Sequence, residues 1–126
     1  MIVFVHGLWL TGVESAWLRR RLSAELGEEA HSFRYHSITD SVSSVVERLH
    51  AFVMALDART VHLVGHSLGS IVILRLLEKH ADVPPGRAVL LGPPIGGSCV
   101  ARRIAGWRLG ARVLGHMVEE ELIEAA

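Results

Sequence analysis

The feature that most restricts the fold of this chain is a short turn flanked by glycines at residues 65–69. The segment Gly-His-Ser-Leu-Gly follows an apolar run that is typical of a strand (61–64), and it opens an apolar run that is typical of a helix (70–74). The two glycines have no Cβ that would obstruct a tight turn between these elements. The pattern therefore predicts a sharp strand-to-helix turn that holds the Ser67 hydroxyl clear of its neighbours.

Strand-like and helix-like segments alternate along most of the chain, which favours a parallel sheet with helices on both faces. We expect an α/β fold with a short parallel sheet of about four strands and a helical C-terminal tail, in a single domain of residues 1–126. The predicted strands are Ile2–Val5, Ser32–His36, Val61–Val64 and Ala88–Leu91, of which the second lies at an edge. The predicted helices run from near Ser15 to Leu26, from a cap at Asp40 or Ser41 through Leu56, and from Gly69 to His80, and the tail ends near Glu124.

The composition argues against several classes of protein. The 13 basic and 13 acidic residues cancel, so no net field favours nucleic acid or an anionic membrane. The first residues lack the basic flank of a signal peptide and no apolar run reaches membrane-spanning length, so we expect a cytoplasmic protein without an integral membrane segment. The lone Cys99 agrees with a reducing compartment. The histidines lack ligand spacing and there is no phosphate loop, so the sequence predicts no metal site and no cofactor.

The high apolar content has two explanations. Half of the residues are hydrophobic and the mean hydropathy is +0.36, so either the core is large or some apolar surface is shared with a partner. A sheet that ends at its fourth strand also leaves an unpaired edge that invites pairing. We therefore expect a homo-oligomer, formed through that edge or through the C-terminal helix.

Two motifs at the ends of predicted strands resemble the α/β-hydrolase fold in its lipase- and esterase-like branch. One is the Gly-x-Ser-x-Gly turn around Ser67, and the other is His6-Gly7 at the end of the first strand. The resemblance covers nearly the whole chain and implies a serine hydrolase that cleaves carboxylic esters. It also implies that Ser67 is the nucleophile and that the main-chain N–H groups of Leu8 and Leu68 hold the oxyanion.

The same resemblance indicates where a small ester substrate would bind. Gly7 lets the backbone turn toward the substrate, and Trp9 and Leu10 follow at the sheet edge where such folds bind ligands. Ile95 lies in a segment that, in the family, enters the cover of the acyl pocket. These four residues form the predicted substrate pocket.

The base that would activate the serine is where the chain departs from the family. The family supplies its acid and its histidine after strands beyond the fourth, and the sequence predicts no such strands. His116 in the tail and His36, with Asp40 four residues on, are the two candidates for the base. His6 and His66 match structural positions of the family and are expected to be buried. The alternative function is a catalytically incomplete fragment that binds apolar ligands or self-associates without turnover.

Overall fold

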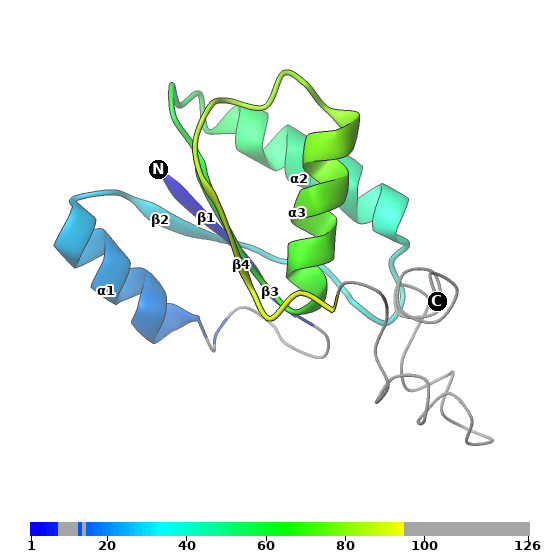
Figure 1. The fold of residues 1–126 in the computed structure, drawn as a ribbon, viewed down its shortest axis with the longest axis horizontal. Helices are drawn as coiled ribbons and strands as arrows, with labels where there is room; N and C mark the ends of the chain where they lie inside the picture. The colour runs from blue at the N-terminus through cyan, green and yellow to red at the C-terminus, as the bar shows by residue number, and fades with distance from the viewer. Residues whose placement is uncertain (8–12, 14, 95–126) are drawn as a thin grey trace.

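The computed structural model describes residues 1–7, 13 and 15–94, and within them four strands alternate with three helices (Figure 1). The strands are β1 (Ile2–Val5), β2 (Ala30–Phe33), β3 (His62–His66) and β4 (Ala88–Leu91), and the helices are α1 (Ala16–Leu26), α2 (Val42–Ala55) and α3 (Leu68–Lys79). All strand pairs are parallel, in the order β2-β1-β3-β4. The α/β class is thus confirmed, whereas the predicted helices of the tail lie outside the described residues.

Helices α2 and α3 cover one face of the sheet and form the main core with it (Figure 1). In α2 the apolar positions recur at helical spacing, so that one stripe is buried. Ser41 begins this helix, since its Oγ accepts a hydrogen bond from the N–H of Ser44 at 3.2 Å. This contact selects Ser41 over Asp40 as the cap. The buried residues that α2 and α3 contribute to this core include Val42, Val45, Val46, Leu49, Val53, Leu68, Val72, Ile73 and Leu76.

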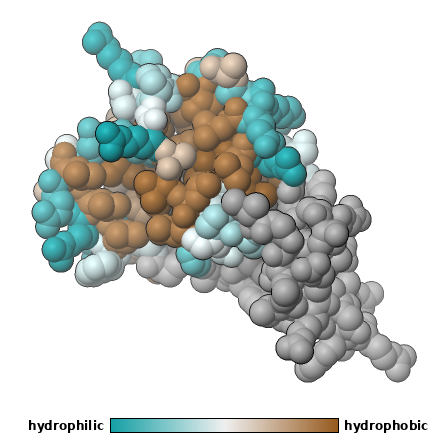
Figure 2. All heavy atoms as spheres, viewed as in Figure 1, coloured by the Kyte–Doolittle hydropathy of each residue, from teal (hydrophilic) through white to brown (hydrophobic). Residues whose placement is uncertain are grey.

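Helix α1 covers the opposite face only in part. Leu18 and Leu22 pack on a small cluster of strand residues, but Trp17 and Leu26 are 70% and 61% exposed. The buried part of this cluster comes from three strand side chains, so it is much smaller than the core on the other face. Figure 2 shows a broad hydrophobic area in this view, and Val89 of β4 is among the exposed apolar residues.

Strand β2 occupies one edge of the sheet, as predicted, but it begins and ends earlier than the sequence indicated. Its ladder with β1 runs from the Ile2–Ala30 pair to the Val5–Phe33 pair. Because β1 has only four residues, the chain beyond Phe33 has no strand beside it to pair with. His36 therefore lies in the loop that follows β2 and not at its end.

Strand β4 occupies the other edge, and within the described part of the chain it pairs with β3 alone. Self-association through this edge stays a prediction. None of the helices in the described residues has the length and apolar character needed to cross a membrane.

Candidate active site

Ser67 occupies a strained turn between β3 and α3. Its backbone angles, φ of 50° and ψ of −119°, lie in a region that residues other than glycine rarely adopt. Two main-chain hydrogen bonds hold the turn: the N–H of Ser67 donates to the carbonyl of Leu91, and the N–H of Ser70 donates to the carbonyl of Ser67, each at 2.9 Å. Strain of this kind persists only where the surroundings enforce it, and it concentrates at functional sites.

The glycines on either side of this turn allow elements to approach closely. A Cβ on Gly65 would lie 2.7 Å from the Cα of Ser70, and a Cβ on Gly69 would lie 2.2 Å from the carbonyl oxygen of Val5. Neither glycine has a positive φ. They are therefore needed for space, so that α3 can begin directly against the ends of β1 and β3.

The strain at Ser67 gives a measurable expectation. We expect Ser67→Gly to have a free energy of unfolding about 1 kcal/mol higher than Ser67→Ala, because relief of the positive φ outweighs the extra entropy of glycine in the unfolded chain. Urea unfolding of the two variants measures the difference, and both lack the hydroxyl, so its loss cancels. A Ser67→Ala variant as stable as Ser67→Gly would show that the turn is not strained.

The loop that follows β1 starts against the Ser67 turn. A Cβ on Gly7 would lie 3.1 Å from the Cβ of Ser67 and 3.1 Å from the carbonyl oxygen of His66. Leu68 is the first residue of α3, and its side chain is fully buried. The two motifs that the sequence singled out therefore meet at the carboxyl edge of the sheet. The other predicted site residues, Leu8, Trp9, Leu10, Ile95 and His116, lie outside the described residues.

His6 is buried and held from several sides by Tyr35. Its Nδ1–H donates to the carbonyl of Gly7 at 2.9 Å, and its Nε2 accepts the main-chain N–H of Tyr35 at 3.3 Å. The two rings stack with centroids 4.2 Å apart, and the Tyr35 hydroxyl donates to the carbonyl of His6 at 2.6 Å. Burial raises the pKa of the Tyr35 hydroxyl, so it stays protonated and able to donate. Both ring nitrogens of His6 thus have hydrogen-bond partners. The expectation that His6 is buried is confirmed.

Tyr35 is a site residue that the sequence did not reveal. We expect Tyr35→Phe to lower the free energy of unfolding by about 1–2 kcal/mol, because it leaves the buried carbonyl of His6 without its donor. It should also reduce any Ser67-dependent activity, since the same contact fixes the start of the Gly7 loop. Urea unfolding and esterase assays of the variant check both effects. Unchanged values in both would show that the contact positions nothing.

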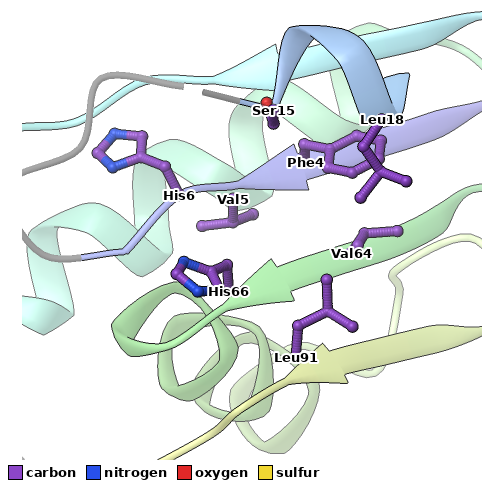
Figure 3. Close-up of a pocket in the computed structure, with 8 residues that line it drawn as sticks. All are labelled: Phe4, Val5, His6, Ser15, Leu18, Val64, His66 and Leu91. Carbon is purple, nitrogen blue, oxygen red and sulfur yellow. The ribbon is translucent and has the colours of Figure 1, made fainter. Parts of the chain in front are cut away.

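His66 is exposed, contrary to the expectation that it would be buried. It lies at the end of β3 and lines an apolar pocket of about 230 Å³ together with Phe4, Leu18, Val64 and Leu91 (Figure 3). His66 follows Val64 by two residues and so shares its face of the sheet. That is the face that α1 leaves partly uncovered, which explains the exposure.

His36 and Ser67 both lie beyond the carboxyl ends of the strands, His36 after β2 and Ser67 after β3. Strand β1 lies between β2 and β3 and so separates the two residues. The main-chain N–H of His36 donates to Asp40 Oδ2 at 2.9 Å, and Arg48 forms a second hydrogen bond to the same oxygen. Partial burial tends to raise the pKa of Asp40, but these two donors outweigh it and hold the pKa below its usual value. Asp40 is thus occupied in shaping the loop, and no hydrogen bond joins Ser67 to a histidine within the described residues. A catalytic role of His36 stays a prediction.

Solved structures similar to this chain match most of its length. Phospholipase PlaB from Legionella pneumophila has a TM-score of 0.75 and 20% identity, and the match covers 97% of this chain and 32% of that one. Lipase BlEst2 from Bacillus licheniformis has a TM-score of 0.73 and 25% identity, with 98% and 55% covered. A monoacylglycerol lipase from Paleococcus ferrophilus has a TM-score of 0.69 and 21% identity, with 85% and 47% covered. This chain thus spans about a third to about half of their lengths.

The sequence of this chain matches a known family over nearly all of its length. A search of curated proteins returned no match. The model of a family described as "Alpha/beta hydrolase family" matches residues 2–124, which is nearly all of the sequence. The chain therefore belongs to the alpha/beta hydrolase family.

Proposed function

We propose that this chain carries the nucleophile of a serine hydrolase that cleaves carboxylic esters. The observation that supports the proposal most strongly is the strained conformation of Ser67 at the start of α3, directly against Gly7. Membership of a hydrolase family agrees with it.

In the proposed reaction, the Oγ of Ser67 attacks the ester carbonyl while a base takes its proton. The N–H of Leu68 is one of the helix-start N–H groups that have no acceptor within the helix, and it is the first oxyanion donor. The N–H of Leu8 is the second. Collapse of the tetrahedral intermediate releases the alcohol with the proton from the base, and water then hydrolyses the acyl-enzyme. His116 and His36 are the proposed bases.

The pocket beside the turn favours an apolar acyl group. Five of its eight lining residues are apolar, and His6 and His66 line it where β1 and β3 end (Figure 3). The similar structures are named as a phospholipase, a lipase and a monoacylglycerol lipase. We therefore propose an ester with a hydrophobic acyl chain as the substrate class. We also propose that the protein is cytoplasmic and forms a homo-oligomer.

Labelling with a fluorophosphonate, a probe that forms an adduct only with an activated serine, tests the proposal. We expect one adduct per chain, located by mass spectrometry on the peptide that contains Ser67, and no adduct in Ser67→Ala. Ser43→Ala on the exposed side of α2 is the matched control and should label normally. Loss of labelling in His36→Ala or His116→Ala identifies the base.

Folded wild-type protein that does not label would overturn the proposal. It would favour the alternative, in which the chain is catalytically incomplete and binds apolar ligands or self-associates without turnover.

A further inference from the structure

A second group of polar side chains lies near the amino ends of the strands, whereas Ser67 lies near their carboxyl ends. His50 lies in α2, His80 ends α3, and Asp82 follows in the next turn. Helix α3 has 12 residues between Ser67 and His80, which corresponds to about 18 Å along the helix axis. The group is therefore separate from the candidate active site.

The side chains of this group contact one another closely. His50 Nε2 lies 2.9 Å from Asp82 Oδ1, and His80 Nε2 lies 3.2 Å from Glu47 Oε1. The two imidazole rings stack with centroids 3.9 Å apart and an interplanar angle of 12°. Ligand atoms from His50, His80 and Asp82 all lie within 4.8 Å of one another. Three atoms of the kinds that bind metals thus lie close to one another.

Burial and charge at this point fit a cation. The side chains of His50 and His80 are only 20% and 16% exposed, so the packing of α2 against α3 restricts both rings. Asp82 supplies one carboxylate, whose negative charge favours a bound cation. Glu47 adds a second carboxylate, paired with Lys79 at 2.7 Å. The cluster combines rigid nitrogen ligands with a charged oxygen ligand that can still rotate.

We propose that His50, His80 and Asp82 bind one transition-metal ion of the zinc type. Two imidazoles and one carboxylate suit Zn²⁺ and other borderline divalent ions better than Ca²⁺ or Mg²⁺, which prefer oxygen ligands alone. Ligand atoms around tetrahedral Zn²⁺ lie about 3.3 Å apart. The three ligand atoms now lie within 4.8 Å of one another, so each pair needs to approach by at most about 1.5 Å. Water or Glu47 completes the coordination.

The bound ion would join the middle of α2 to the end of α3. Because metal binding to the folded chain alone adds to its stability, Zn²⁺ should raise the unfolding temperature. The ion lies too far from Ser67 to take part in ester hydrolysis, so its effect is on the fold. Sequence spacing did not reveal the site, since the two histidines belong to different helices and are 30 residues apart.

Calorimetric titration of the EDTA-treated full chain with ZnCl₂ tests the proposal, supported by the visible absorption of Co²⁺, which reports tetrahedral coordination. We expect one ion per chain, and an affinity at least about tenfold lower in Asp82→Asn and in His50→Gln. His31→Gln is the matched control, because His31 lies in β2 and pairs with Glu29 at 3.3 Å instead of with this cluster. Zn²⁺ should also raise the unfolding temperature of the wild type and of His31→Gln, but not of Asp82→Asn.

Two results would overturn the metal site. One is the absence of Zn²⁺ binding by the wild type, and the other is equal affinity in wild type and Asp82→Asn. The Asp82 side chain is 60% exposed, so this variant is expected to fold and to keep the test decisive. Neither result bears on Ser67, whose labelling is measured separately.

Discussion

Ser67→Ala is expected to lower the rate of hydrolysis of a p-nitrophenyl ester by about a thousandfold or more. The proposed reaction passes through an acyl-enzyme on Oγ, and no other atom of the turn can form that bond. The oxyanion donors are main-chain N–H groups, so they survive the substitution and leave a small residual rate above that of water. Steady-state kinetics with the purified chain measure the loss, which should fall on kcat.

The control for this experiment separates chemistry from folding. Ser43→Ala changes an equivalent side chain on the exposed side of α2 and should keep the wild-type rate. Urea unfolding of Ser67→Ala should show a two-state transition close to that of the wild type, because alanine keeps the Cβ and the same strained backbone. Equal rates in Ser67→Ala and the wild type would exclude Ser67 as the nucleophile.

Local patterns in the sequence predicted the elements that position Ser67. Strands β1 and β4 have the predicted bounds, and the turn at residues 65–69 joins a strand to a helix as expected. These elements are encoded by short apolar runs and by turn residues, which act over a few positions. The bounds of β2 depended instead on the length of its neighbour β1, and so the prediction missed them by two or three residues.

Contacts between distant segments account for the rest of what the sequence did not reveal. His66 is exposed because α1 covers little of its face, and nothing in the local sequence states how far a helix covers a sheet. Tyr35 forms a hydrogen bond with His6, which is 29 residues away in the sequence. His50 contacts Asp82, which is 32 residues away in the sequence, because α2 packs against α3. In each case the sequence shows a residue suited to the contact, but only the fold selects its partner.

Gly69→Ala is expected to lower the free energy of unfolding by about 3 kcal/mol or more. Gly69 lies inside α3, where alanine by itself would stabilise the helix by about 1 kcal/mol. The new Cβ would, however, lie 2.2 Å from the carbonyl oxygen of Val5 and 2.4 Å from that of His6. Both are main-chain atoms that cannot rotate away, so α3 must move off the end of β1. The clash therefore outweighs the helix propensity.

Urea unfolding of Gly69→Ala measures this loss, and Gly27→Ala is its matched control. Gly27 ends α1 with a φ of 65° and has nothing within 4 Å of a Cβ, so alanine there should cost only about 1 kcal/mol through backbone strain. Because Ser67 directly precedes α3 and Leu68 is the first residue of α3, the shift in Gly69→Ala should also abolish fluorophosphonate labelling, whereas Gly27→Ala should label normally. A Gly69→Ala protein as stable and as reactive as Gly27→Ala would show that α3 does not depend on this contact with β1, and that the position of Ser67 is set by the turn alone.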